Sequence, residues 1–435
     1  MMNQILYYYR TLKRNIKAFG FLQTFIYALF RMHPVWFSMV VQRLNVSGSS
    51  HPSLGDIDYK PGMDSVLHYQ SWQEYGGTEM PKKSKDKRPC YIWFVPDWEN
   101  VWGGGHYTLF RFAQQIGVSR NARQIIFVYH NLRHETPDAL QLTLDGAIKD
   151  CMLEVVVDPK QLPACDAALA TTWQSAYWAR AFPFAKKKFY FMQDYESLFY
   201  AHGTASMQAN NSYEFGFTGI TGGQWLKSQY ISHGGVAQNY LFAADKNIFY
   251  PAQKDAAVRP HVKRLFFYGR PSTERRCFEL GMTSLSLIAK EFPDVEIVIA
   301  GLKLNNPPPF PATLMGNMPL ADTGELYRTC DLGLAFSGTN LSYLPVELMA
   351  CGVPVITNRG PHVEWHCKHN ENAYLAEPTP EAVLEAFREL YNSQELRQKL
   401  ASGGVATMKN ISWQDEIEKV AKWIDQNLTE QDLAA

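Results

Sequence analysis

The chain has 435 residues, of which 46% are apolar and 19% charged, and its 42 basic side chains balance 42 acidic ones. This length allows two or three domains with sizeable cores, and zero net charge argues against a nucleic-acid binder that relies on a broad basic surface. The seven cysteines are scattered without a CxxC pair, so neither a disulfide framework nor a zinc site is indicated and a reducing, cytoplasmic setting fits best.

Residues 1–87 are predicted to form a helical extension and a linker ahead of the first sheet. Within residues 1–37, basic side chains share one helical face and apolar side chains another; the basic ones are Arg10, Lys13, Arg14 and Lys17. A basic amphipathic helix suits peripheral contact with anionic lipids at the inner face of the plasma membrane. The same pattern suits a helical pair packed on the body of the protein, and both interpretations stay open.

Strands alternate with helices in the first predicted domain, residues 88–250. Strands are expected at Tyr91–Val95, Gln124–Tyr129, Leu153–Val157, Ala167–Ala170, Lys188–Met192 and Gly216–Ile220. This alternation predicts right-handed βαβ units and a parallel sheet. A glycine-rich loop, Gly103–His106, follows the first strand and precedes a helix.

A second alternating series makes the second predicted domain, residues 251–412. Strands are expected at Arg264–Tyr268, Val295–Ala300, Leu332–Phe336 and Val353–Ile356, with a helix over Glu274–Phe292. The last segment, residues 413–435, contains an amphipathic helix that is expected to pack back on the first domain. Two Rossmann-like domains in tandem place a ligand in the cleft between the carboxyl ends of their strands.

The loop and helix after Leu332–Phe336 have the composition of an anion site. Ser337–Asn340 is a polar loop and Pro345 suits a first helical turn, so free backbone N–H groups face the cleft. Glu347 follows in the first turns, where its carboxylate can reach ribose hydroxyls. A glutamate that only complements the helix dipole is the alternative.

The order of these features resembles the nucleotide-sugar domain of family-4 glycosyltransferases of the two-Rossmann, GT-B type. The resemblance covers roughly residues 90 to 425 and is carried by Gly269-Arg270, Glu274-Arg275, Ile297–Gly301, Glu325–Tyr327, Cys330-Asp331, Pro345–Thr357 and the junction Tyr240–Pro251. A closer resemblance, to bacterial rhamnosyltransferases of cell-surface polysaccharide synthesis, is carried by Gly103–His106, Phe189–Tyr200, Phe267–Pro271 and Ser342–Glu347.

The resemblance implies a donor site that works without a metal or another cofactor. Arg270 and Arg275, the latter where relatives usually have Lys, would bind the diphosphate and offset the charge growing on the leaving phosphate. The alternative is surface pairing of these arginines with Glu274 or Glu279. Glu347 would hold the ribose, and the other donor-binding candidates are Gly104, Gly105, Thr339, Asn340 and the stretch Leu341, Ser342 and Tyr343.

Thr339 marks a departure from the family pattern. Relatives usually carry a second glutamate at this position, eight residues before Glu347, near the transferred sugar. A deoxy sugar such as rhamnose lacks a hydroxyl for that carboxylate to bind, which is consistent with the loss.

Three catalytic residues are expected: Asp194, Arg270 and Glu347. Asp194 follows a strand and would meet the acceptor or sugar, acting as a base if the enzyme inverts; a helix N-cap is the alternative. Asp97, His106 and Tyr195 are expected at the acceptor or sugar.

The predicted function is transfer of L-rhamnose from dTDP-L-rhamnose to a growing surface glycan on a lipid-linked acceptor, with retention. A glycosyltransferase using another UDP- or GDP-sugar and a non-catalytic glycan-assembly scaffold remain alternatives, and no nucleic-acid partner is expected.

Overall fold

The computed structural model describes residues 86–98, 100–129, 136–252, 259–304 and 306–432, which fall within one compact unit, Gly62–Ala435. The amphipathic helix expected in residues 1–37 lies outside the described residues and stays a prediction. None of the helices in the described ranges is both long and apolar enough to cross a membrane.

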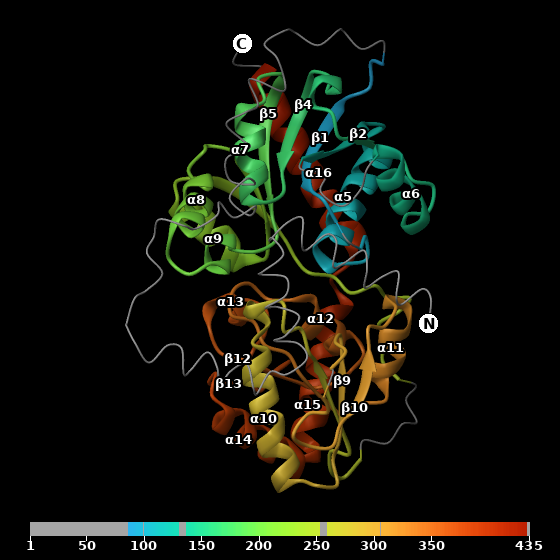
Figure 1. The fold of residues 1–435 in the computed structure, drawn as a ribbon, viewed down its shortest axis with the longest axis vertical. Helices are drawn as coiled ribbons and strands as arrows, with labels where there is room; N and C mark the ends of the chain where they lie inside the picture. The colour runs from blue at the N-terminus through green and yellow to red at the C-terminus, as the bar shows by residue number, and fades with distance from the viewer. Residues whose placement is uncertain (1–85, 99, 130–135, 253–258, 305, 433–435) are drawn as a thin grey trace, which may run out of the picture. The chain divides into compact units, whose positions relative to one another are not determined.

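The first sheet has seven parallel strands in the order β3-β2-β1-β4-β5-β6-β7 (Figure 1). They are β1 (Cys90–Pro96), β2 (Arg123–Tyr129), β3 (Leu153–Val156), β4 (Cys165–Ala170), β5 (Ala185–Met192), β6 (Thr218–Gly222) and β7 (Val236–Tyr240). In the central β1, all residues from Cys90 to Val95 are buried, which is why the strand is a continuous apolar run rather than an alternating one.

Helices follow most of the strands of this sheet: α5 (Gly104–Arg120), α6 (Pro137–Ala147), α7 (Trp173–Ala181), α8 (Thr204–Ser212) and α9 (Gln224–Ser232). The short 3₁₀ helices η3 (Pro159–Gln161) and η4 (Glu196–Phe199) interrupt the connections. Side chains define where some of the helices begin. At α7, Thr172 Oγ1 accepts a hydrogen bond from the Ser175 N–H, and Ser175 Oγ accepts one from the Thr172 N–H, so the helix begins with a reciprocal cap.

The second sheet has six parallel strands in the order β10-β9-β8-β11-β12-β13. Its strands are β8 (Arg264–Tyr268), β9 (Glu296–Ala300), β10 (Thr313–Gly316), β11 (Leu332–Leu334), β12 (Val355–Asn358) and β13 (Tyr374–Ala376). Its helices are η5 (Glu274–Arg276), α10 (Phe278–Glu291), α11 (Leu320–Arg328), α12 (Tyr343–Ala350), α13 (Pro361–Glu364), α14 (Pro380–Asn392) and α15 (Gln394–Lys409). In both sheets the strand order reverses beside the first strand, which places a crevice at the carboxyl ends.

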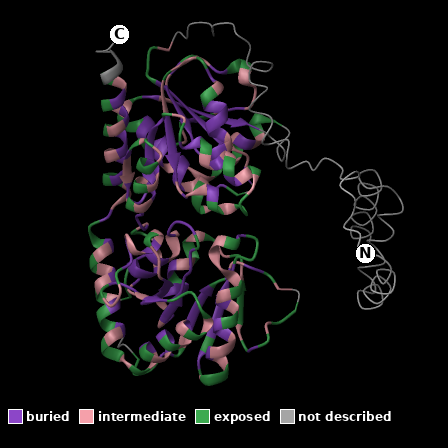
Figure 2. Cartoon of the chain, turned by 90° about the vertical axis from the view of Figure 1, so that its left-hand side faces the viewer, coloured by how far each residue is buried: buried purple, intermediate pink, exposed green. Residues whose placement is uncertain are grey.

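Figure 2 shows most strands of both sheets buried and many exposed residues on the outer faces of the helices. The predicted strands are confirmed to within a few residues. The helix predicted from Glu274 is wrong at its start, because Cys277 has a left-handed φ of 50° and separates η5 from α10. The prediction also missed three strands: β7, whose sequence VAQNY has little apolar character, β10, which is largely exposed, and β13, which has only three residues.

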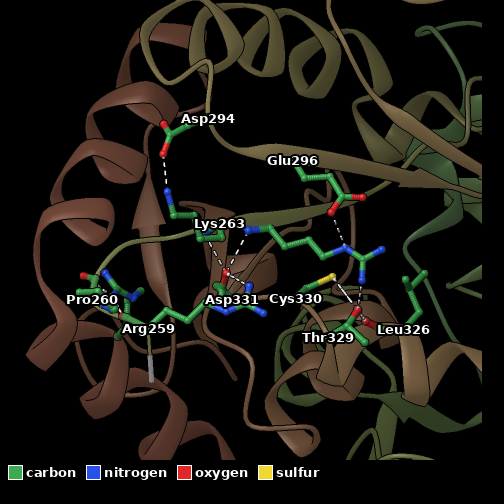
Figure 3. Close-up of polar contacts among 11 residues, drawn as sticks. Arg259, Pro260, Lys263, Asp294, Glu296, Leu326, Thr329, Cys330 and Asp331 are labelled. Carbon is green, nitrogen blue, oxygen red and sulfur yellow. Dashed lines mark hydrogen bonds and ion pairs between the residues drawn. The ribbon is translucent and has the colours of Figure 1, made fainter. Parts of the chain in front are cut away.

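Asp331 links the amino ends of β8 and β11 in the second sheet. Its Oδ2 accepts hydrogen bonds from the backbone N–H groups of Lys263 (2.8 Å) and Arg264 (2.9 Å) and from Arg259 Nη1 (3.1 Å; Figure 3). The Cys330-Asp331 part of the family pattern thus lies at the opposite edge of the sheet from the crevice and has a structural role.

The last helix, α16 (Trp413–Asp432), packs against β7, α5 and β5 of the first domain. Trp423 Nε1 donates to the Gly219 carbonyl of β6 (3.1 Å), and Arg120 at the end of α5 pairs with Glu418 and Asp425 (both 2.8 Å). The chain therefore crosses from the first domain to the second and returns.

Candidate functional site

The carboxyl ends of the two sheets are joined through Asn340, which follows β11 and is fully buried. Its Nδ2 donates to the carbonyls of Gln193 (3.0 Å) and Gly222 (2.7 Å), which follow β5 and end β6. Its Oδ1 accepts from Trp365 Nε1 (3.2 Å). Both amide hydrogens are thereby used on protein groups, so the Asn340 side chain, expected at the donor, links the two domains in this structure.

Asp194 lies beside this link and is only 8% exposed. Its Oδ1 accepts from the N–H groups of Asn340 (2.8 Å) and Tyr195 (2.9 Å), and its Oδ2 lies 3.3 Å from Arg275 Nε and 3.8 Å from Arg276 Nη2. The N-cap position of η4 is Tyr195 rather than Asp194. Asp194 therefore does not cap that helix; it is the counter-ion of a cluster of arginines.

That cluster contains Arg270, Arg275 and Arg276, all from the turn after β8. The Arg275 guanidinium lies 4.0 Å above the Phe199 ring, while Arg276 Nη1 donates to Ser337 Oγ and to the Asn340 carbonyl. Burial, opposed by the charge of Asp194 and aided by the charges of Arg275 and Arg270, lowers the pKa of Arg276 to about 10.

Two guanidinium groups, those of Arg275 and Arg276, thus face one carboxylate. The charge of Arg270 acts on Arg276 as well, and this local excess of positive charge suits a dianionic ligand. Arg270 is exposed, and no ion pair joins it to the described residues. Arg275 pairs with Asp194 rather than with Glu274 or Glu279, so the surface-pairing alternative is not what the structure has. Arg276 was missed by the sequence interpretation, although the Arg-Arg pair directly before α10 was a visible signal.

The amino end of α12 faces the glycine-rich loop of the first domain. The helix begins at Tyr343, whose ring stacks on Phe242 with centroids 4.6 Å apart, and a Cβ on Gly104 would lie 3.8 Å from that ring. The Gly105 carbonyl accepts from Gln193 Nε2 (2.8 Å). One predicted donor contact is corrected here: the Leu341 N–H donates to the His362 carbonyl (3.1 Å), which leaves those of Ser342 and Tyr343 for an anion.

Glu347 lies in the second turn of α12 and is half-buried. Tyr327 Oη donates to its carboxylate (3.3 Å), and burial raises the pKa of Glu347 to about 7, partly offset by that hydrogen bond. A glutamate kept only to complement the helix dipole would be expected in the exposed first turn, so the half-buried position in the second turn favours a more specific role.

The predicted acceptor residues are not brought together with the arginines by any contact among the described residues. His106 Nε2 lies 3.3 Å from the Pro96 carbonyl, and its ring packs near Trp98 and Phe110. The Tyr195 hydroxyl contacts Asn210 Oδ1 (3.1 Å) and His233 Nε2 (2.8 Å), within the first domain. Asp97 is half-buried near the end of β1.

A small pocket of about 430 Å³ adjoins the arginine cluster. It is lined from the first domain by Leu198 and Phe199, and from the second by Ser272–Arg275, Gly338 and Thr339. Thr339 is only 2% exposed, and its Oγ1 has no hydrogen-bond partner among the described residues. A buried hydroxyl without a partner calls for an explanation, and a ligand in this pocket would provide one.

Comparison with solved structures identifies the fold. The structure superposes on sucrose-phosphate synthase from Thermosynechococcus elongatus with a TM-score of 0.59 at 12% identity, covering 80% of this chain and 100% of that one. Anabaena HepE in complex with UDP and glucose superposes with a TM-score of 0.58 at 16% identity, covering 78% of this chain and 99% of that one. S. aureus TarM in complex with ligands that include UDP superposes with a TM-score of 0.59 at 9% identity, covering 78% of this chain and 99% of that one. The chain has the GT-B fold.

Sequence comparison adds one family match and one relative. Residues 263–388 match the family model described as WsaF, C-terminal domain. The O-antigen biosynthesis protein RfbC of Myxococcus xanthus is 38% identical over 353 residues, which are 78% of this chain and 27% of that protein. The chain therefore spans about a quarter of the length of this curated relative.

Within the GT-B frame, Asp194, Arg270, Arg275, Thr339 and Asn340 converge at the carboxyl edges of both sheets, with Gly104 and Tyr343 beside them. This arrangement can hold an anionic group between the arginines and the amino end of α12, next to a small, partly apolar pocket. Among the described residues, no three potential metal-ligating side chains converge.

Proposed function

We propose that this protein is a glycosyltransferase that transfers L-rhamnose from dTDP-L-rhamnose to a growing cell-surface glycan, on a lipid-linked acceptor and without a metal or cofactor. The observation that carries the proposal is the cluster of Arg270, Arg275 and Arg276 at the amino side of α10, facing the amino end of α12 and the pocket at Thr339. The similarity to RfbC supports the class, since RfbC is an O-antigen biosynthesis protein.

In this proposal, each part of the donor meets a group of matching chemistry. The diphosphate lies against Arg270, Arg275 and the N–H groups of Ser342 and Tyr343, and Glu347 accepts hydrogen bonds from the ribose. As the bond between the sugar and the diphosphate breaks, negative charge grows on the leaving phosphate, where fixed cations stabilise it most.

The position of Asp194 favours retention of configuration. Both of its carboxylate oxygens are engaged, by Asn340, Tyr195 and the arginines, so it is poorly placed to remove a proton from an acceptor. In a retaining transfer the acceptor hydroxyl attacks the face that the diphosphate leaves, the new glycosidic bond forms there, and the leaving phosphate oxygen takes the proton.

The nature of the sugar rests on Thr339 and its neighbours. A hydroxyl in place of the usual carboxylate, with Leu198 and Phe199 across the pocket, suits a sugar that presents a methyl group. If Thr339→Glu raised turnover of the rhamnose donor, this part of the proposal would be overturned. HepE and TarM were solved with UDP, so a UDP-sugar is the second candidate donor.

Arg270→Ala is the direct test of the phosphate clamp. Loss of one charge-assisted contact in the transition state is expected to reduce kcat/KM by about 10²–10³-fold. Because Arg270 is exposed and its loss leaves no buried group unpaired, the free energy of unfolding should change by no more than about 0.5 kcal/mol. Wild-type turnover in this variant would end the assignment.

Thermal-shift titration identifies the nucleotide and separates the enzyme from a scaffold. A ligand that binds the native state raises the midpoint as its concentration exceeds Kd. We expect a shift with dTDP that EDTA leaves unchanged; a shift only with UDP or GDP would replace rhamnose by another sugar. Nucleotide binding without turnover on any acceptor would favour a non-catalytic assembly protein.

Peripheral attachment to the inner face of the plasma membrane is part of the proposal and rests on the basic pattern of residues 1–37. Co-flotation with anionic vesicles, but not with neutral ones, is expected, and replacing Arg10, Lys13, Arg14 and Lys17 by Gln should abolish it.

A further inference from the structure

A second and larger cavity lies in the first domain, outside the donor site. It is a groove of about 1320 Å³ bounded by α7, η4 and α8, roughly three times the volume of the pocket at Thr339. Leu198 lines both of them. The groove therefore begins where the pocket ends and leads away from the arginines along α8.

The walls of the groove combine exposed apolar side chains with amides. Leu198 and Met207 are 52% and 60% exposed, and the amide residues Gln208, Asn210 and Asn211 of α8 also line the groove. Apolar walls with a few well-placed polar groups are typical of small-molecule sites. Sugar rings match them, because they offer apolar C–H faces and hydroxyls that both donate and accept.

Part of the hydrogen-bonding capacity of these amides is unused. Gln208 Oε1 is buried and has no partner among the described residues. Asn210 Oδ1 accepts from Tyr195, and Asn211 Nδ2 donates to Tyr177 Oη (both 3.1 Å); in the described part of the chain, Asn210 Nδ2 and Asn211 Oδ1 make no hydrogen bond. The Asn210 amide nitrogen, which donates, and the Asn211 amide oxygen, which accepts, are left to face a ligand, and this pair suits hydroxyl groups better than a ligand of one polarity.

The charges at the groove indicate a neutral occupant. Arg180 and Glu214 bring opposite signs, and the Arg180 guanidinium is already placed 4.3 Å above the Phe215 ring. A polyanion such as a nucleic acid would need an excess of cations here.

We propose that this groove binds the acceptor glycan as a chain of several sugars. The sugar that receives the new residue lies at the Leu198 end, next to the donor pocket, and the preceding sugars lie along α8. This inference rests on the proposed function, since it assigns a second substrate to the same enzyme, and it makes Met207 and the α8 amides determinants of acceptor length.

The test is the dependence of acceptor KM on chain length. Full-length protein is assayed with dTDP-L-rhamnose and α-linked rhamno-oligosaccharides of one to four units. We expect KM to fall at least tenfold from the monosaccharide to the tetrasaccharide in the wild type. Met207→Trp, which fills the groove from an exposed position, should remove this dependence while leaving donor KM and acceptor-independent donor hydrolysis within twofold of the wild type.

The matched control is Leu142→Trp on α6, a change at a residue that is 71% exposed and does not line the groove. It should keep the length dependence, and both variants should keep the thermal midpoint. A length dependence that survives in Met207→Trp, or one that is absent from the wild type, would overturn the proposal.

Failure of the proposed function gives a different result. If the wild type neither hydrolyses nor transfers the donor, binding of the tetrasaccharide is measured by saturation-transfer NMR. A signal that Met207→Trp abolishes and Leu142→Trp keeps would support the groove in a non-catalytic protein. No signal with the wild type would overturn it.

Discussion

Arg276 and Asp194 form the most buried part of the charged cluster, and their structural role differs from that of their exposed neighbour Arg270. The guanidinium of Arg276 holds Ser337 and the Asn340 carbonyl in place, while Asp194 limits the repulsion among the three cations. A cation in this position supports the loops on either side of the site as well as contributing charge. Arg270 has no such packing role.

The first prediction follows from this contrast. Arg276→Ala removes two hydrogen bonds and one buried partner of Asp194, and should lower the free energy of unfolding by about 2–4 kcal/mol. Urea unfolding of the variant measures this loss, with Arg270→Ala as the exposed control. Equal stability of the two variants would contradict the supporting role of Arg276.

A second prediction concerns the pKa of Glu347, which is about 7 in the folded protein against an ordinary value of 4.5. Between these pH values the unfolded chain is ionised at this site while the folded chain keeps its proton. The contribution of Glu347 to stability therefore falls as pH rises from 4.5 through 7, by up to about 3 kcal/mol at about 1.4 kcal/mol per unit.

Glu347→Gln has no such titration, so its thermal midpoint relative to the wild type should rise over that range and level off above it. Melting curves of both proteins in matched buffers provide the comparison. A midpoint difference that does not change with pH would show that Glu347 ionises normally in the fold.

At the scale of elements, the amino edge of the second sheet depends on the Asp331 carboxylate. Asp331→Asn keeps the shape but loses the charge that strengthens three hydrogen bonds, and a loss of about 1–2 kcal/mol is expected. Asp294→Asn is the matched control, because its ion pair with Lys263 is half exposed and should contribute less than about 1 kcal/mol. Both changes should leave nucleotide binding intact, and a larger effect for Asp294 would reverse the assignment.

The elements that could be predicted are those in which the local signal agrees with the final environment. Buried strands such as β8 are short apolar runs whose bounds follow from the sequence alone. The edge strand β10 is exposed at three of its four residues, so its pairing with β9 depends on its neighbour and not on its own composition. The interruption between η5 and α10 at Cys277 could not be predicted for a related reason. A left-handed φ at a non-glycine residue is set by the surrounding turn and not by the residue itself.

At the scale of the whole molecule, the site is made from loops that are far apart in sequence. The pattern near Glu347 indicates one half of it, but the contact between Asn340 and Asp194 spans 146 residues. Nothing local to either residue predicts that the asparagine joins two domains or that the aspartate meets arginines. The groove along α8 was likewise invisible, because its residues are ordinary helix surface until η4 and α7 enclose them.

The return of α16 to the first domain has a mechanical consequence. The chain passes between the domains twice, and the two passages are bonded to each other: the Leu241 N–H donates to Glu416 Oε2 (2.8 Å), and Lys246 Nζ donates to the Lys409 carbonyl (3.1 Å). Two linkers fastened side by side behave as a single hinge, which permits rotation about one short axis and resists twisting about others. For the proposed enzyme, opening about this hinge would move Arg275 and Asn340 away from Asp194 together, so the cluster would re-form with the same partners on closure.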